Sequence, residues 1–267
     1  MNPVAARLRL THIGGPTVLI ELDGWRILSD PTFDPPGQRY QFGWGTASRK
    51  MAGPAVAIGD LGHLDAILLT HDHHADNLDA TGRTLLADVA TVITTVAGAA
   101  RLGGGTIGLE PWDTTLLEAP GRTPLRVVAT PCRHGPPLSH PIVGDVVGFG
   151  LSDGANGMTA LWISGDTVLF DGVREVADRL HVDVALLHLG GVRFPITGPL
   201  HYTMTIDDGI ELCRSITPRV AIPVHYEGWS HFRQGRDAIE RALRGAPDEV
   251  QKMFRFLELG EPTDVTP

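Results

Sequence analysis

The stretch LDAILLTHDHHADNLD, residues 64–79, decides how the rest of the chain is interpreted. Its apolar first half is typical of a buried strand, which stops at His71. Three histidines and three aspartates lie between positions 71 and 79. Imidazole and carboxylate groups together suit zinc, and also iron or manganese. Because His71 and His73 stand two residues apart at a strand end, the pair can chelate one ion.

Later strand-like runs also end close to a metal-binding type of side chain: His134, Asp166 and His225. Strand ends that meet at one edge of a sandwich can build a shared site from their loops. A single strand-end histidine is more often a solvated loop residue, and Gly-Asp after a strand is commonly just a turn. Four such pieces in one chain are hard to explain as accident, so the sequence predicts one shared metal centre.

The composition favours a soluble globular protein over other classes. The chain has 267 residues, a net charge of −9 and 42% hydrophobic residues. No Lys/Arg-rich run is present, so we expect no nucleic-acid partner. Cys132 and Cys213 are too few for a disulfide framework. The N-terminus lacks the apolar core of a signal peptide and no apolar run reaches transmembrane length, which predicts a cytoplasmic protein; a homo-oligomer is possible.

Short apolar runs and amphipathic runs predict a mixed α/β fold. Strands are expected at residues 17–22, 26–30, 64–70, 90–96, 125–130, 146–151, 159–164, 182–188 and 219–224. Helices are expected at residues 77–88, 171–180, 206–215 and 234–243, the third opening with a capping box of Thr205 and Asp208. No linker divides the chain, which predicts a single domain over residues 1–267. Its expected architecture is a four-layer αββα sandwich, with helices outside two facing sheets.

On these motifs the chain resembles the metallo-β-lactamase fold superfamily. It is most similar to the branch that contains ascorbate-6-phosphate lactonase and N-acyl-phosphatidylethanolamine phospholipase D. The resemblance rests on LTHIGGPTVLIELDGWRILSDPTF, LDAILLTHDHHADNLD, TPCRHG, WISGDT, VALLHLGG, HYTMTIDDGIEL and AIPVHYEGW, which follow in family order. It implies the αββα sandwich with its site on one edge. It also implies two divalent metal ions, zinc above iron or manganese, and hydrolysis by a metal-activated water.

The resemblance implies six metal ligands: His71, His73, His134 and Asp166 for the first ion, and Asp76, Asp166 and His225 for the second. The family motif in the loop is H-x-H-x-D-H, and the chain departs from it. Ala75 stands where Asp is expected, Asp76 arrives one residue late, and Asn77 replaces the last His. A one-residue insertion accounts for this spacing. A neutral amide oxygen is a weak zinc ligand, so we expect a weaker second metal site.

Three residues are candidates for catalysis. His74 either turns inward to restore the lost imidazole or serves as a general acid; an exposed loop histidine is the third interpretation. Asp76 would orient the attacking water and accept its proton. His201 lies ahead of a helix, as in related members, and would contact the substrate or protonate the leaving group; a solvated helix start is the competing interpretation.

Other residues are expected around the metals. Asp30 would hydrogen-bond the metal loop or a ligand's second nitrogen, or else form a plain Asp-Pro turn. Asn77 would also lie just outside the ligands. His188 would line the pocket floor, although core packing is an equal alternative. Tyr40 and Trp44, in the aromatic and basic segment 33–51, would form a lid over an apolar or anionic substrate, or simply pack as a structural loop.

These features favour a metal-dependent hydrolase, with zinc the expected metal, acting on a small ester, lactone or phosphoester. One alternative is a phosphodiesterase acting on lipid or nucleic acid, which the lack of a basic groove disfavours. The other is a non-catalytic metal-dependent binder or sensor with a degenerate second site. Asn77 keeps that alternative open, whereas the number of retained ligands argues against it. The fold alone does not identify the substrate.

Overall fold

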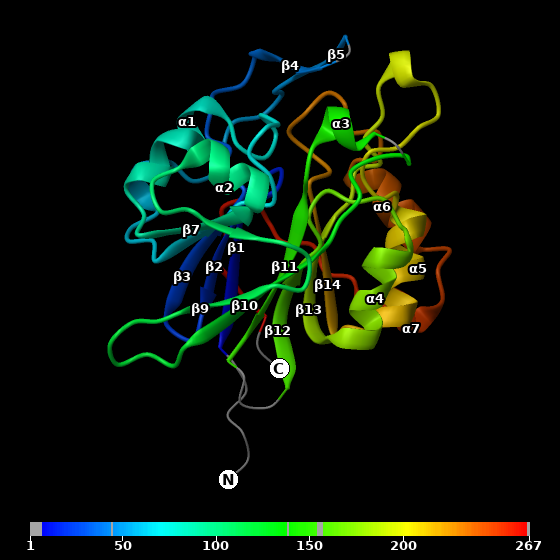
Figure 1. The fold of residues 1–267 in the computed structure, drawn as a ribbon. Coiled ribbons are helices and arrows are strands. Elements are labelled where there is room, and N and C mark those ends of the chain that lie inside the picture. Colours follow the sequence, from blue (N-terminus) through cyan, green and yellow to red (C-terminus); the bar gives the residue numbers. More distant parts are fainter. Residues whose placement is uncertain (1–6, 44, 138, 154–156, 266–267) are drawn as a thin grey trace.

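The computed structural model describes residues 7–43, 45–137, 139–153 and 157–265. In these ranges two β-sheets face each other, and helices cover the outer face of each (Figure 1). The predicted αββα sandwich is therefore confirmed. No helix within the described part of the chain is long and apolar enough to cross a bilayer.

The first sheet joins an antiparallel meander to a parallel half. Its strand order is β15 (Thr263–Asp264), β1 (Leu8–Gly14), β2 (Thr17–Leu22), β3 (Trp25–Ser29), β6 (Ala66–Leu68), β7 (Thr91–Thr95) and β8 (Ile107–Leu109). The strands from β3 to β8 run parallel. Because parallel strands end at the same edge, Asp30 after β3 and His71 after β6 emerge side by side.

The second sheet has the same division. Its order is β14 (Val220–Val224), β13 (His181–His188), β12 (Met158–Ile163), β11 (Val147–Ser152), β10 (Leu125–Pro131) and β9 (Thr114–Leu117). Strands β12, β13 and β14 are parallel neighbours. Their carboxyl ends carry Asp166, His188 and His225, which the topology therefore brings to one edge.

The side chains of each strand alternate between two cores. Leu161 and Ile163 point into the core between the sheets, where they join Phe149, whereas Trp162 points to the helices outside. This is the period-2 pattern of a strand buried on both faces. The helices over the second sheet are α4 (Asp171–Arg179), α5 (Ile206–Ile216), α6 (Arg236–Leu243) and α7 (Asp248–Met253). Those over the first are α1 (Ala80–Thr84) and α2 (Val96–Leu102).

The predicted elements are largely confirmed, with differences that have local causes. The predicted capping box of Thr205 and Asp208 is present at the start of α5. The helix predicted from residue 77 begins only at Ala80, because the Asp79 carboxylate accepts a hydrogen bond from Gly82 N and caps it there. It ends as the 3₁₀ helix η2 (Leu85–Ala87). The segment predicted as a loop contains a hairpin, β4 (Arg39–Gly43) and β5 (Thr46–Arg49).

The shorter helices lie around the loops. They are α3 (His140–Val143) and the 3₁₀ helices η1 (Ile58–Asp60) and η3 (Pro195–Thr197). The β4–β5 hairpin and α3 stand at the end of the sandwich where the parallel strands finish (Figure 1). They therefore lie around the edge that carries the histidine and aspartate side chains described next.

Candidate metal centre

Three buried histidines form the first cluster at this edge. His74 Nδ1 lies 3.1 Å from His71 Nε2 and 3.1 Å from His134 Nε2. Two nitrogens bound to one tetrahedral zinc at its usual bond length lie about 3.3 Å apart, so this spacing suits a single ion. His134 Nδ1 lies 2.7 Å from the carbonyl oxygen of Tyr202, to which it donates a hydrogen bond. That bond leaves Nε2 as the free lone pair.

Burial keeps these imidazoles neutral. Burial, together with the neighbouring histidines, holds the pKa of His71 and of His74 well below the ordinary value. Burial also lowers the pKa of His134. Neutral imidazole is the form that ligates a metal, so no proton has to leave these side chains on binding at neutral pH.

A second cluster contains a carboxylate and two more histidines. Asp166 Oδ1 lies 2.9 Å from His188 Nδ1, and Asp166 Oδ2 lies 3.5 Å from His225 Nε2. All three side chains are fully buried. One potential ligand atom from each lies within 4.8 Å of the others, as also holds for His71, His74 and His134. The edge therefore carries two separate groups with metal-ligand geometry.

Asp76 extends the second cluster toward a further histidine. Its Oδ2 atom lies 3.4 Å from His225 Nε2 and 2.9 Å from His231 Nε2. Burial disfavours charge on Asp76 and on His225, but the attraction between these two side chains is stronger. The pKa of Asp76 is held well below its usual range, and the carboxylates of Asp166 and Asp76 raise the pKa of His225 to about 9.

Buried polar atoms without a hydrogen-bond partner concentrate at this edge. In the described ranges, such atoms at the site are Asp30 Oδ2, Asp76 Oδ1, Asn77 Oδ1, Asp166 Oδ2, His188 Nε2 and both ring nitrogens of His225. Buried polar groups are normally paired, because an unpaired one costs free energy. Divalent cations among these oxygens and nitrogens would satisfy most of them. The residues present therefore fit bound metal.

The backbone is strained at two of these positions. Asp30 has φ of 36° and His225 has φ of 57°, a left-handed conformation that residues other than glycine rarely adopt. The Asp30 side chain accepts hydrogen bonds from Thr70 N, at 2.7 Å, and Thr70 Oγ1, at 2.9 Å. Asp30 thus contacts the metal loop, as the sequence suggested. Strain of this kind clusters at functional sites.

The loop brings His74 Nδ1 within 3.1 Å of both His71 and His134, whereas His73 packs against the His71 ring, at a centroid distance of 4.9 Å, without joining that cluster. The His73 ring lies against Gly144, where an added Cβ would come within 2.6 Å of its Cε1 atom, and Nε2 contacts the carbonyl oxygen of Val143. His73 is thus outside both clusters, although the sequence assigned it to the first ion. The sequence did contain an indication that His74 is the second histidine of the motif: His74 and Asp76 have the H-x-D spacing that the motif requires.

A small cavity of about 60 Å³ opens beside the first cluster. Its lining is mostly aromatic and aliphatic: Phe42, Gly43, Thr46, His74, Asp76, His134, Val143, Val192, Phe194, Thr197, Tyr202 and His231. Phe194 stacks on His231 with ring centroids 5.4 Å apart and an interplanar angle of 9°. None of these lining residues is a lysine or an arginine. Phe42 belongs to the aromatic segment that the sequence predicted as a lid, whereas Phe194 and Tyr202 were not identified, because single aromatic residues in loops carry no motif.

The structure places the other predicted substrate residues as follows. Tyr40 donates a hydrogen bond to Asp34 Oδ2 at 2.6 Å and packs on Trp229, so it is not among the cavity-lining residues. Trp44 lies outside the described residues. His201 is half-buried, and its neighbour Tyr202 lines the cavity instead.

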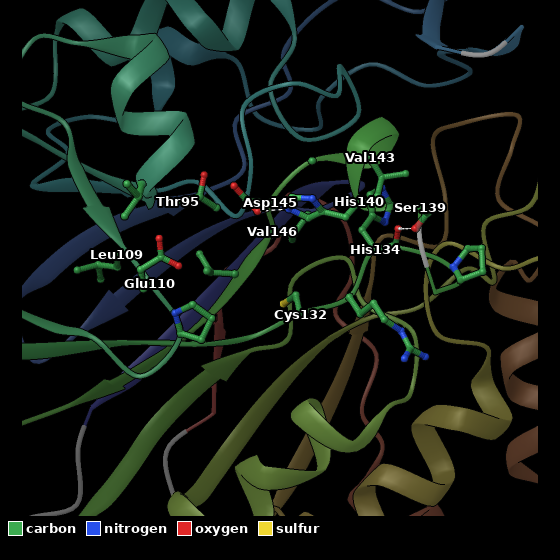
Figure 2. Close-up of a pocket in the computed structure, with 16 residues that line it drawn as sticks. Thr95, Leu109, Glu110, Cys132, His134, Ser139, His140, Val143, Asp145 and Val146 are labelled. Atoms are coloured by element: carbon green, nitrogen blue, oxygen red, sulfur yellow. Dashed lines mark hydrogen bonds and ion pairs between the residues drawn. The ribbon is translucent and has the colours of Figure 1, made fainter.

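A larger cavity of about 220 Å³ lies on another side of His134. Figure 2 shows His134, Cys132 and Ser139 along it, with Glu110 and Asp145 among its other labelled residues. Burial raises the pKa of Cys132 well above that of an ordinary thiol, and its Sγ contacts the carbonyl oxygen of Ser164 at 3.0 Å. This thiol therefore packs as a neutral group.

Comparison with known proteins identifies the class. Residues 25–226 match the family described as the Beta-lactamase superfamily domain, so the chain belongs to this superfamily. A UPF0173 metal-dependent hydrolase of Thermofilum pendens is 28% identical, over 84% of this chain and 86% of that protein. One from Thermoplasma acidophilum is also 28% identical, over 68% and 73%. The prediction of a metallo-hydrolase of this superfamily is confirmed by these relatives.

Solved structures agree with the fold. A possible metal-dependent hydrolase from Veillonella parvula matches with a TM-score of 0.81 and 18% identity, over 98% of this chain and all of that one. Isothiocyanate hydrolase from Delia radicum gut bacteria matches with a TM-score of 0.79 and 19% identity, over 97% of this chain and 100% of its own. At such identities the likeness concerns the fold alone.

Proposed function

We propose that this metal-dependent hydrolase uses two divalent metal ions to cleave a small, uncharged ester or lactone. The observation that carries the proposal is that two buried clusters with metal-ligand geometry lie at one edge, and that His74, His134 and Asp76 of this edge line a largely apolar cavity. Bound metal would activate a water molecule and polarise the carbonyl group of the substrate. Zinc suits neutral imidazole with carboxylate, and iron or manganese is the alternative.

The ligand set follows the geometry. In this proposal the first ion is held by His71, His74 and His134. The second is held by Asp76, Asp166 and His225, with Asp166 shared between the ions as the resemblance implies. His74 takes the role that the sequence analysis gave to His73. This exchange of ligands is consistent with a one-residue insertion in the loop. Asn77, whose side-chain oxygen has no partner among the described residues, stays outside the ligand set.

Three side chains prepare the site for water and substrate. The Asp76 carboxylate stays charged, accepts a hydrogen bond at Oδ2 from His231, and keeps Oδ1 free to accept one from the attacking water. Phe42 and Phe194 exclude other water from the cavity. A role for His201 in leaving-group protonation remains a prediction.

The lining favours an uncharged substrate over a phosphoester. The cavity has apolar walls and the Asp76 carboxylate, without a lysine or arginine among its lining residues. An anionic phosphodiester would lack the cationic side chains that usually hold phosphate oxygens. The phosphodiesterase is therefore the second candidate, together with the metal-dependent binder. The lactonase-containing branch, the cytoplasmic location and a homo-oligomeric state remain predictions.

A matched substrate panel tests the proposal. Protein loaded with Zn²⁺, Mn²⁺ or Fe²⁺ is assayed with p-nitrophenyl acetate, p-nitrophenyl butyrate, γ- and δ-lactones and bis(p-nitrophenyl) phosphate. We expect turnover of esters or lactones that is lost in Asp166→Ala, with the phosphodiester at least about tenfold slower, which corresponds to 1.4 kcal/mol. Preference for the phosphodiester would overturn the substrate class. No turnover by fully loaded protein would favour the binder.

A further inference from the structure

We propose that His188 is a ligand of the second metal ion through Nδ1, and that Asp30 Oδ2 holds the ring in place by accepting a hydrogen bond from Nε2–H. The inference rests on the two-ion site proposed above, and it adds to that site a nitrogen ligand that comes from a different strand than the metal loop. His188 was expected only to line the pocket floor or to pack in the core.

The fold directs His188 into the second cluster. It is the last residue of β13, between the parallel strands β12 and β14, whose ends carry Asp166 and His225. Its Nδ1 atom lies 2.9 Å from Asp166 Oδ1. Its ring stacks on that of His225, with centroids 5.4 Å apart and an interplanar angle of 20°. The Nδ1 atom therefore faces the same space as the two neighbouring ligands.

The other ring nitrogen points to an unsatisfied carboxylate oxygen. His188 Nε2 lies 4.0 Å from Asp30 Oδ2, and neither atom has a hydrogen-bond partner among the described residues. Both side chains are fully buried. A metal-bound histidine commonly donates its remaining N–H to a carboxylate, which fixes the orientation of the ring. A shift of about 1 Å would bring this pair to hydrogen-bond distance.

Asp30 is itself firmly placed. Its second oxygen, Oδ1, accepts two hydrogen bonds from Thr70, the residue before His71. One carboxylate thus connects the loop of the first ion to His188 of the second. This double role explains why Asp30 adopts a left-handed backbone conformation despite the strain.

His188 supplies what the metal loop lacks. Asn77 stands where the motif has a histidine, its Nδ2 atom donates to Thr70 Oγ1 at 3.3 Å, and it offers the ion only a weak amide oxygen. With His188, the second ion would have two carboxylates, Asp76 and Asp166, and two imidazoles. Carboxylate oxygens and imidazole nitrogens are both ligands that zinc accepts.

Metal titration separates this role from simple packing. The full chain is stripped of metal and titrated with Zn²⁺, or with Co²⁺ read by its visible absorption, and bound metal is counted by elemental analysis. We expect about two equivalents in the wild type and about one in His188→Ala. The exposed His181, at the other end of β13, provides the matched control, and His181→Ala should bind two equivalents.

The outcomes distinguish the possible failures. Two equivalents in His188→Ala, bound as tightly as in the wild type, would overturn the role of His188 while leaving the two-ion hydrolase intact. Fewer than two in the wild type would overturn the two-ion site itself. If His188→Ala does not fold, Asp30→Asn decides, because its amide oxygen can still accept from Thr70 but its NH2 group cannot accept a hydrogen bond from His188 Nε2. We expect it to weaken the second ion 10- to 100-fold, and unchanged affinity would refute the inference.

Discussion

Lys50 Nζ lies 2.7 Å from Asp79 Oδ2, and the two side chains are only 4% and 0% exposed. Asp79 also accepts hydrogen bonds from Asp34 N, at 2.6 Å, and from Gly82 N, at 2.8 Å. One buried carboxylate therefore joins three segments: Lys50 directly after β5, the segment after β3, and the first turn of α1. This arrangement fixes the β4–β5 hairpin, and with it Phe42, relative to the metal loop.

Removing one partner of this pair should be costly. We expect Lys50→Met to lower the free energy of unfolding by about 3–5 kcal/mol, because it leaves the Asp79 charge buried and unpaired. Urea denaturation at pH 7 measures the change. Glu175→Gln, which breaks the exposed Glu175–Arg179 pair on α4, is the control and should cost no more than about 0.5 kcal/mol. Equal losses in the two variants would contradict the prediction.

Phe42 should set the preference for apolar acyl groups. Phe42→Ala opens the wall beside His74 and His231, whose rings lie 5.4 and 5.3 Å from that of Phe42. We expect kcat/KM for p-nitrophenyl butyrate to fall about tenfold, as the loss of about two buried methylene groups would produce, and that for the acetate to change little. Tyr40→Phe, outside the cavity, is the matched control. A uniform loss for both esters would argue against a specificity role.

Metal should stabilise the fold as well as support activity. Free metal at 1,000 times its Kd adds about 4 kcal/mol for one site, so a chelator should lower Tm measurably. The Asp166 side chain faces both His188 and His225, so we expect the shift to be much smaller in Asp166→Ala. Differential scanning calorimetry with and without chelator gives both values. A chelator that leaves the Tm of the wild type unchanged would show that metal binding is not coupled to folding.

Asp65 should make stability depend on pH in the acid range. Burial opposes its charge, but hydrogen bonds from Arg26 N and Arg122 Nη1, at 2.8 and 2.7 Å, prevail and lower the pKa of Asp65 below 3.8. This stabilisation is complete above the unfolded pKa and is lost as the pH falls through the lower folded pKa. Asp65→Asn should therefore lower stability by about 1.5 kcal/mol at pH 7, a difference that shrinks below pH 3.8.

Urea titrations from pH 7 to pH 3 measure that difference. The exposed Glu118, changed to Gln, is the control and should have little effect at any pH. A deficit of Asp65→Asn that stays constant down to pH 3 would mean that the charge of Asp65 does not contribute.

Cys213 should resist thiol reagents in the native protein. It is 1% exposed on α5, and burial raises its pKa to about 12. The thiolate is the reactive form, so at pH 8 native Cys213 should label far more slowly with iodoacetamide than the same residue in urea. Peptide mass spectrometry follows the labelling of each cysteine separately. Rapid native labelling would show that α5 opens readily.

The sequence predicted the parts of the structure that depend on local patterns. The strand at 17–22 was located to the residue because the hairpin turn at Asp23 and Gly24 follows it directly. His71, His134, Asp166 and His225 were found because each lies just beyond the end of a strand. The edge they share then follows from the parallel topology.

The parts that sequence analysis did not predict depend on geometry between distant segments. The choice between His73 and His74 is made by an irregular turn, where a one-residue insertion rotates the side chains and where Gly144 makes room for His73. The proximity of His188 to Asp30 requires the two sheets to be packed together. Phe42 in β4 and Phe194 in a loop are far apart in the sequence, yet their ring centroids lie 6.0 Å apart, and no local pattern predicts this contact.

The pairing of β15 with β1 has a consequence for how the molecule assembles. Asp264 lies opposite Arg9, 255 residues away along the chain, and their side chains are also joined by an ion pair. Until this closure forms, the outer backbone groups of β1 are open to any other extended segment. The contact is weak in itself but has the largest sequence separation in the sheet. Forming it therefore costs the chain a large amount of conformational entropy. We infer that this edge closes late in folding, and that it is the place where a partly folded chain would first pair with another molecule.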